Sequence, residues 1–583
     1  MKLQTGPITM ALAMLAALGD PFAVVRAEPG YTVQQNVPVA MPDGTKLGAD
    51  VYLPNTGEKF SAILVRTPYD KRGKEWLAKI FASNGYAVVV QDVRGMNASE
   101  GVFIPFIHEK QDGLDTLDWM TAKPWSDGKI GMWGSSYVAY CAVVLAPHGH
   151  PALKTIINMS GWGDGEKIAY PGGAMHLMLL LPWMLSSQIH GQGSFQDYDW
   201  PTAFRHVPVS EIPASMGVRS VPWEHAMKRS MNDPGPAATT MEGQYDKVDL
   251  PILHITGWND FVARGTLDLV EHLDQAGRSA ERPFRKLMVG PWRHDQIWLE
   301  ETKVGDEDYG PQSRMGIPKV GEICVRWFDR WLKDEKNRLE EEPTVELYVM
   351  GSNEWRTFDR WPPRTVAFQP WYLDSVQGAN SAAGDGLLSP ALPQMGERDG
   401  FVFDPMDPAP TTGGVNFHFF LDNLGPKDQR PVENRSDVLV YTSAPMTKDV
   451  DVIGPLQVVL FASTEGKQTD FTAKLVEVRA DGYARIIEDG IKRGPDAVDG
   501  RPVATMEPAS VYRFTIDLGA TAITIKQGHR LRVEVSSSNF PKYTRNPNTG
   551  ENSETAAVFN KVRQTIFHSP TYPSHVLLPM VQP

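Results

Sequence analysis

The chain has 583 residues, 42% of them hydrophobic and 22% charged, with a formal net charge of -13. This length predicts several globular domains, and the composition offers enough apolar side chains for several cores. No cluster of Lys and Arg forms a basic face, so we do not expect a nucleic-acid-binding protein. The two cysteines, Cys141 and Cys324, are too few for a disulfide framework, and no Cys/His cluster predicts zinc. We therefore expect no metal ion and no cofactor, and we interpret Cys141 as a small buried hydrophobe.

The first 27 residues have the pattern of a secretory signal peptide. Lys2 precedes an apolar stretch over residues 8–19, and residues 25–27 (Val-Arg-Ala) resemble a cleavage site. This pattern predicts a periplasmic or secreted protein, whereas an unprocessed terminus would leave it cytoplasmic. Elsewhere the sequence contains no stretch of about 18 uncharged apolar residues, so we predict no membrane span.

Residues 28–163 alternate between strand and helix patterns. The expected strands cover residues 46–53, 61–66, 86–93 and 130–133, and the expected helices cover residues 75–84, 110–122 and 137–146. Strands that alternate with helices predict a parallel sheet with right-handed crossovers. The same rhythm returns over residues 248–339, with strands at 250–256 and 285–289 and helices at 266–276 and 321–332.

The segment between these two parts and the segment after them have other patterns. Residues 164–247 are rich in Met, Trp, His and Pro and predict irregular helices, an insertion that would cap the sheet and roof a pocket. Residues 340–583 contain short β-rich runs separated by turn signals, a pattern typical of an all-β jelly roll. We therefore predict an α/β domain with an inserted helical cap and a C-terminal jelly-roll domain.

A candidate nucleophile lies where the strand at 130–133 meets the helix that begins at Tyr137. The sequence there is Gly-Met-Trp-Gly-Ser-Ser-Tyr-Val-Ala over residues 131–139. A nucleophilic serine needs a sharp strand-to-helix turn with small neighbours, and Gly134 supplies one of them two residues before Ser136. Ser135 is the rival nucleophile, but Trp133 would then occupy the crowded position. The other interpretation of Ser136 is a helix N-cap.

Two further residues complete the pattern of a catalytic triad. Asp260 follows the expected strand at 250–256, and His294 follows the expected strand at 285–289. Parallel sheets carry functional groups at the carboxyl ends of their strands, and the order Ser, Asp, His is that of α/β-hydrolases. His294 would act as the base that activates Ser136, and Asp260 would orient the imidazole.

The loop after the strand at 61–66 contains Tyr69. In hydrolases of this fold this loop supplies donors to the oxyanion hole, and a phenol there could donate a hydrogen bond. The alternative interpretation of Tyr69 is a packing aromatic residue.

These motifs resemble those of the cocaine esterase, glutaryl-cephalosporin acylase and X-Pro dipeptidyl-peptidase family of α/β-hydrolases, over residues 37–579. The motifs that carry the resemblance are residues 66–69 (RTPY), 91–95 (QDVRG), 125–131 (WSDGKIG), 257–260 (GWND), 290–294 (GPWRH) and 405–414 (PMDPAPTTGG). The resemblance implies the three-domain fold, the triad and an oxyanion hole formed by the Tyr69 hydroxyl and the Tyr137 backbone N–H. It also implies that Trp162 and Trp292 line the acyl pocket. The sequence departs from the family at Ala139, where the family usually has glycine.

The expected activity is hydrolysis of a small-molecule carboxylic ester or amide through an acyl-enzyme on Ser136. A dipeptidyl-peptidase or α-amino-acid ester hydrolase would need carboxylates for a free ammonium group. Asp164 and Glu166 are candidates, although they resemble solvated turn residues, and residues 261–264 offer no carboxylate pair. We therefore favour an esterase or acylase that does not recognise an amino group. A non-catalytic binding protein is the remaining class, and the sequence leaves open whether the protein forms a homo-oligomer.

Overall fold

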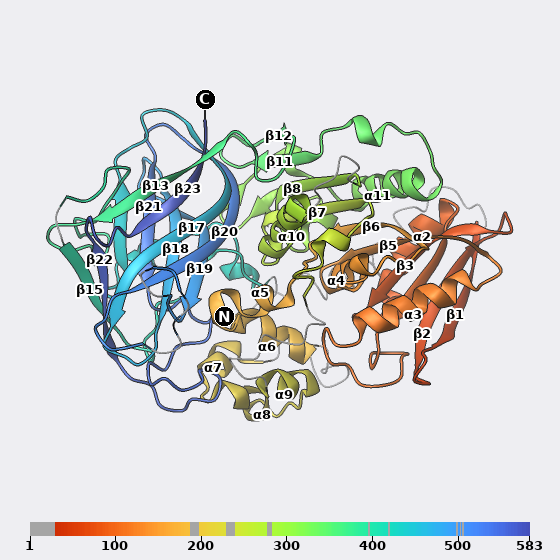
Figure 1. Ribbon diagram of the computed structural model, residues 1–583, viewed down its shortest axis with the longest axis horizontal. Coiled ribbons are helices and arrows are strands. Elements are labelled where there is room, and N and C mark those ends of the chain that lie inside the picture. The colour runs from red at the N-terminus through yellow and green to blue at the C-terminus, as the bar shows by residue number, and fades with distance from the viewer. Residues whose placement is uncertain are drawn as a thin grey trace.

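The computed structural model describes residues 30–186, 198–228, 240–276, 283–394, 397–417, 420–496, 499–501, 503 and 506–582. The described chain forms an α/β part, a group of short helices and a β-rich part, drawn respectively in red to green, yellow and blue in Figure 1. The predicted signal peptide, residues 1–27, lies outside the described residues. Within the described part of the chain, no helix is both long and apolar enough to cross a membrane.

The α/β part is built on a sheet of ten described strands in the order β1-β2-β4-β3-β5-β6-β7-β8-β11-β12. The strands are β1 Tyr31–Ala40, β2 Lys46–Pro54, β3 Phe60–Thr67, β4 Ala87–Asp92, β5 Ser126–Ser135, β6 Leu153–Met159, β7 Ile252–Asn259, β8 Arg285–Arg293, β11 Val345–Val349 and β12 Glu354–Phe358. Strands β3 to β8 and β11 pair in parallel. Every residue of β4 and β7 is buried, as expected for strands covered on both faces.

Helices cover both faces of this sheet. The helices are α2 Glu75–Ser83, α3 Glu109–Thr121, α4 Tyr137–Val143, α10 Ala263–Ala276 and α11 Ile317–Leu332. Side chains of α2 and α11 share one hydrophobic core with the sheet, and those of α3, α4 and α10 share the core on the opposite face. The predicted α/β-hydrolase fold class is thereby confirmed.

The structure differs from the sequence-based expectation at four strands of this sheet: β1, β6 and β12 are absent from the predicted elements, and β11 lies in the segment assigned to the jelly roll. Strand β6 is absent from the predicted elements, because its run Leu-Lys-Thr-Ile-Ile-Asn-Met carries polar residues among the apolar ones. The prediction that the jelly roll begins at residue 340 places β11 in that domain, but β11 pairs in parallel with β8 and antiparallel with β12. The catalytic sheet therefore extends to Phe358, since β8 would otherwise be left as an exposed edge.

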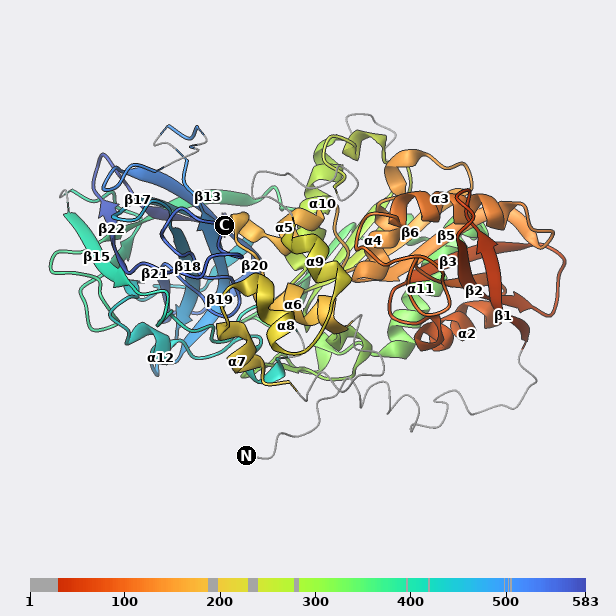
Figure 2. The same cartoon turned by 90° about the horizontal axis from the view of Figure 1, so that it is seen from below.

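The insertion between β6 and β7 contains short helices that lie between the other two parts (Figure 2). These helices are α5 Gly165–Ala169, α6 Leu177–Ser186, α7 Trp200–Arg205, α8 Ile212–Ser215 and α9 Val221–Met227. Helix α6 has eight buried residues and Pro182 in its interior, and its side chains form a small core with those of α7, α8 and α9. The described residues of the insertion thus form a helical layer that packs partly on its own core.

The C-terminal part is a jelly roll whose described strands pair antiparallel, except for β14 and β16, which pair in parallel. Its described strands are β13 Val366–Asp374, β14 Leu387–Ser389, β15 Glu397–Phe403, β16 Leu439–Ser443, β17 Val450–Thr464, β18 Asp470–Val478, β19 Ala484–Arg493, β20 Tyr512–Ile525, β21 Arg530–Ser536, β22 Val562–His568 and β23 His575–Val581. One continuous core joins Ile523 of β20 to Val289 and Val349 of the catalytic sheet. The jelly roll therefore packs directly on the α/β part.

Candidate active site

Ser136 occupies a strained turn between β5 and α4. Its backbone has φ 63° and ψ -131°, a conformation that is rare for any residue with a side chain. Strand β5 ends at Ser135 and α4 begins at Tyr137, so the Ser136 side chain projects from the carboxyl end of the sheet. This is the strand–turn–helix geometry that exposes a nucleophilic hydroxyl in α/β-hydrolases.

Glycines make room for this turn. A Cβ atom on Gly134 would lie 2.3 Å from the backbone nitrogen of Ala139, so no larger residue fits there. A Cβ atom on Gly161 would lie 2.6 Å from the Ala139 methyl group. Ala139, which stands where the family usually has glycine, therefore fits in this turn because Gly161 opposite it has no side chain.

His294 and Asp260 form a hydrogen-bonded pair at the ends of neighbouring strands. Asp260 directly follows β7 and His294 directly follows β8, and the His294 Nδ1 atom lies 2.8 Å from Asp260 Oδ1. The side chain of Asp260 is 2% exposed and that of His294 is 9% exposed. A buried carboxylate held against an imidazole is the arrangement that stabilises an imidazolium during proton transfer.

Two more groups hold the Asp260 carboxylate, and one of them has no signal in the sequence. The backbone N–H of Val262 donates to Oδ1 at 3.0 Å, and the Ser160 hydroxyl donates to Oδ2 at 2.6 Å. Ser160 is buried and has a positive φ of 53°. It follows β6, the unpredicted strand, and stands 100 positions before its partner, so no local sequence pattern could have found it.

The Tyr69 hydroxyl lies close enough to the Ser136 side chain for that side chain to affect the pKa of Tyr69. It also accepts a hydrogen bond of 3.0 Å from the indole N–H of Trp183, which lies on cap helix α6. Although 39% of the Tyr69 surface is exposed, desolvation of the hydroxyl raises the pKa of Tyr69 to about 12. The phenol thus stays protonated at neutral pH and lies beside the candidate nucleophile. Trp183 is a second residue of the site that the sequence motifs do not reveal.

Tyr137, the residue after the candidate nucleophile, is held in place by two hydrogen bonds of its hydroxyl group. The Tyr137 hydroxyl donates to Glu109 Oε1 at 2.6 Å and accepts from the backbone N–H of Phe106 at 2.7 Å. Burial raises the pKa of the Glu109 carboxyl. These contacts orient the Tyr137 ring toward the core at the first residue of α4, where the backbone N–H can point to the site.

Aromatic side chains surround these polar groups. Phe261 lies against His294 with ring centres 4.4 Å apart, and Phe417 from the C-terminal part contacts Phe261 at 5.3 Å. On the cap side, Trp183 stacks on Phe106 at 6.2 Å. Such walls suit an apolar acyl or leaving group.

The two tryptophans expected to line the acyl pocket are both buried. Trp162 is 5% exposed and stacks on Tyr140, with ring centres 5.9 Å apart. Trp292 is 2% exposed, and its indole N–H donates to the Ser313 carbonyl oxygen at 2.6 Å. Gly257 and Gly290 make room for Trp292, since a Cβ atom on either would lie within 2.4 Å of it. Trp292 therefore packs in the core, and these contacts do not support a role for it in the acyl pocket.

Asp164, one of the two candidate ammonium ligands, caps a helix. The Asp164 carboxylate accepts from the backbone N–H of Glu166 at 2.9 Å and forms the N-cap of α5. This is the role expected of a turn aspartate. Among the described residues, no group of three or more His, Cys, Asp or Glu side chains could hold a metal ion. Cys141 and Cys324 are both free and buried.

The fold and the site together define a serine hydrolase of the α/β type. Comparison with known proteins agrees: the X-Pro dipeptidyl-peptidase (S15 family) pattern matches residues 43–296, and the X-Pro dipeptidyl-peptidase C-terminal non-catalytic domain matches residues 337–577. The chain is 34% identical to the cocaine esterase of Rhodococcus sp. (strain MB1 Bresler), over 95% of this chain and 99% of that protein. It therefore belongs to the S15 and cocaine esterase family of serine hydrolases, as the motifs indicated.

Two solved structures match along nearly the whole chain. An α-amino acid ester hydrolase is 26% identical, covers 99% of this chain and 100% of its own, and has a TM-score of 0.78. An aminopeptidase from a marine sediment archaeon, Thaumarchaeota archaeon, has a TM-score of 0.80 at 23% identity, covering 97% of this chain and 99% of its own. The likeness to the aminopeptidase shows the fold alone.

Proposed function

We propose that this protein hydrolyses small-molecule carboxylic esters through an acyl-enzyme on Ser136, with His294 as general base and acid. The observation that carries the proposal is the strained Ser136 turn, with the Tyr69 hydroxyl beside the Ser136 side chain and the buried His294–Asp260 pair on nearby strand ends. Each group has the chemistry that its role requires.

In this mechanism the Ser136 Oγ attacks the acyl carbonyl carbon while His294 accepts the hydroxyl proton. The carbonyl oxygen becomes an oxyanion, which receives hydrogen bonds from the Tyr69 hydroxyl and the Tyr137 backbone N–H. The C–O bond to the leaving group breaks, and the imidazolium returns its proton to the departing alkoxide. Water then attacks the acyl-enzyme by the same route in reverse, with Asp260 stabilising the imidazolium in both halves.

The apolar walls formed by Phe261, Phe417 and Trp183 support an ester with an apolar acyl group over a charged one. A free amino group needs a carboxylate that is not already engaged, and Asp164 is engaged as a helix cap. The relatives named as a cocaine esterase and an α-amino acid ester hydrolase support esters as the substrate class. Acylase activity on amides is the second activity that the same chemistry allows.

The test combines active-site labelling with a substrate comparison. A fluorophosphonate should add one adduct to the wild-type protein at Ser136 and none to Ser136→Ala, as measured by mass spectrometry. Ser136→Ala should lower kcat on an activated p-nitrophenyl ester by on the order of 10⁴ to 10⁶, because triad members act as a unit. A matched Ser135→Ala variant, altered at the neighbouring serine, should keep most of the activity. Normal turnover by Ser136→Ala would refute the assignment of the nucleophile.

The same assay separates the substrate alternatives. We expect higher kcat/KM for a phenyl ester of an unsubstituted acid than for the matched α-amino-acid ester or an Xaa-Pro p-nitroanilide. A preference of more than tenfold for either amino substrate would instead establish recognition of the free amino group.

The remaining proposals concern processing and assembly. We propose that residues 1–27 are a signal peptide that directs the protein to the periplasm or the exterior, and that residues 164–247 form the cap of the catalytic domain. Amino-terminal sequencing of the exported protein tests the first proposal. Sedimentation analysis would show whether the protein forms a homo-oligomer.

A further inference from the structure

The jelly roll contacts the segment that carries Asp260. This segment runs from the end of β7 into helix α10, whose second residue is Arg264. The Arg264 guanidinium donates from Nη2 to the backbone carbonyl oxygen of Asp517 at 2.8 Å, and its Nε lies 3.2 Å from Asp517 Oδ2. Asp517 belongs to β20 of the jelly roll, so this arginine joins the two domains four residues after Asp260.

The strand that receives Arg264 is locally bent. In the pairing of β17 with β20, Leu456 faces Gly519 and Gln457 faces Asp517, so Leu518 is an extra residue in a β-bulge. Gly519 has a φ of +93°, and its N–H donates to Asp517 Oδ1 at 2.8 Å. On the neighbouring strand, a Cβ atom on Gly490 would lie 2.1 Å from the Asp517 carbonyl oxygen. The bulge and the glycines therefore hold Asp517 in the position where Arg264 contacts it.

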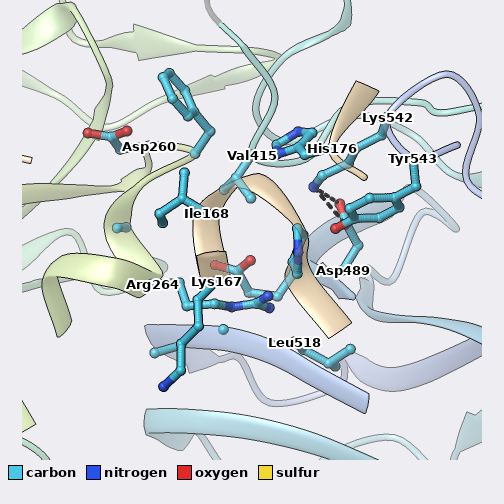
Figure 3. A pocket seen from close by; sticks show the side chains of 16 residues that line it. Lys167, Ile168, His176, Asp260, Arg264, Val415, Asp489, Leu518, Lys542 and Tyr543 are labelled. Atoms are coloured by element: carbon cyan, nitrogen blue, oxygen red, sulfur yellow. Dashed lines mark hydrogen bonds and ion pairs between the residues drawn. The ribbon is translucent and has the colours of Figure 1, made fainter. Parts of the chain in front are cut away.

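Beneath the Asp260 segment lies a polar cavity of about 40 Å³ (Figure 3). Asp260, Arg264 and Leu518 line it, and so do Asp489 and Lys542, whose ion pair of 2.6 Å closes the far side. A space of this size holds a few water molecules, so close packing is interrupted there. On this side the Arg264 contact is therefore a direct polar link between the segment and the jelly roll.

We propose that Arg264 is a positioning residue that fixes the Asp260 segment against the β20 bulge, so that the jelly roll helps to set the geometry of the catalytic acid. This inference rests on the proposed role of Asp260. Small displacements in a catalytic group lower the rate strongly, by up to about 10² for 1 Å. Ser160 and the Val262 N–H also hold the carboxylate, so we expect a partial loss on removal of the guanidinium.

The experiment compares Arg264→Ala with a matched arginine at the same domain interface. Arg356 of β12 bonds to Asp451 of β17 at 2.5 Å, which makes Arg356→Ala the control. Arg264→Ala should lower kcat on an activated ester about tenfold with KM within twofold, because the contact acts on the catalytic acid and not on substrate binding. Arg356→Ala should leave both constants within twofold of wild type.

A second readout does not depend on turnover. Hydrogen exchange in a peptide covering residues 257–266 should be faster in Arg264→Ala than in wild type and unchanged in Arg356→Ala. Asp517→Ala should have a smaller effect than Arg264→Ala, since the backbone carbonyl remains, and the double variant should be no worse than Arg264→Ala. Arg264→Lys, which keeps the charge, serves if the alanine variant does not fold, and it should recover part of the rate.

The results separate this inference from the proposed function. Unchanged exchange in Arg264→Ala, a kcat within twofold of wild type, or an equal loss in Arg356→Ala would overturn the positioning role while the function stands. If the wild-type protein neither turns over esters nor reacts with a fluorophosphonate, the proposed function fails, and the exchange comparison still decides whether Arg264 holds the segment.

Discussion

Replacing Tyr69 by phenylalanine would remove a single oxygen atom from the site and leave the ring in place. That oxygen accepts from the Trp183 indole N–H at 3.0 Å and lies beside the Ser136 side chain, so its own proton can be donated to a developing oxyanion. Desolvation that raises the pKa of Tyr69 to about 12 also strengthens a hydrogen bond to negative charge, because the local dielectric is low.

The expected loss can be estimated from these contacts. One preorganised oxyanion donor is worth about 10² to 10³ in kcat, or roughly 3–4 kcal/mol. The effect should fall on kcat with little change in KM, because the oxyanion exists only in the transition state and the intermediate. The variant also leaves the Trp183 N–H without this acceptor, which should lower the stability by about 0.5–1.5 kcal/mol.

Steady-state kinetics on a p-nitrophenyl ester and thermal unfolding together test this reasoning. Trp183→Phe is the control, since it removes the hydrogen bond to the Tyr69 oxygen and keeps the phenol. A kcat loss below about threefold in Tyr69→Phe would leave the Tyr137 backbone N–H as the main donor and make Tyr69 a packing residue. A rise in KM as large as the fall in kcat/KM would instead indicate a role in substrate binding.

Two further predictions concern the acid and the pH profile, and a third concerns the domains. Ser160→Ala should lower kcat by about tenfold and stability by about 1.5–3 kcal/mol, because a hydrogen bond of 2.6 Å to the buried Asp260 carboxylate is lost, and an unchanged kcat would assign Ser160 to packing alone. The raised pKa keeps Tyr69 in its donating O–H form below about pH 12, so kcat of the wild-type protein should not fall between about pH 9 and 10.5. A fall in this range that is absent from Tyr69→Phe would contradict the role of Tyr69. A chain ending at Lys336 would lack β11, β12 and the jelly roll and would expose Val289 and Trp258, so it should aggregate, and a soluble, fully active product would refute the shared core.

Much of the catalytic arrangement could be predicted, because each catalytic residue lies in a short segment whose sequence pattern can be recognised by itself. Ser136 stands between an apolar strand and a helix with Gly134 two residues before it, and this short pattern encodes the strained turn. Asp260 and His294 each follow a short run with a strand-like pattern, and parallel strands bring their carboxyl ends to one edge. The α/β order, the helical insertion and the β-rich C-terminal part are likewise visible as changes in hydrophobic period.

Strand β6 could not be predicted in the same way, because Lys154, Thr155 and Asn158 interrupt its apolar run and the burial of the last two depends on contacts with other elements. Thr155, for example, accepts a hydrogen bond from the Trp327 indole N–H, 172 positions away. Strand β11 has the same residue pattern as a jelly-roll strand, and only its pairing with β8 assigns it to the catalytic sheet.

The sequence by itself determined the chemistry of the site, since residue type and strand or helix period are properties of short segments. The tertiary structure alone decided which distant residues hold that chemistry in place. Ser160 reaches Asp260 across 100 positions, Trp183 reaches Tyr69 across 114, and Arg264 reaches Asp517 across 253. Each contact joins residues whose local sequence patterns carry no information about one another. It exists only because the packing of cap, sheet and jelly roll brings their surfaces within hydrogen-bond distance, a result that depends on the whole chain.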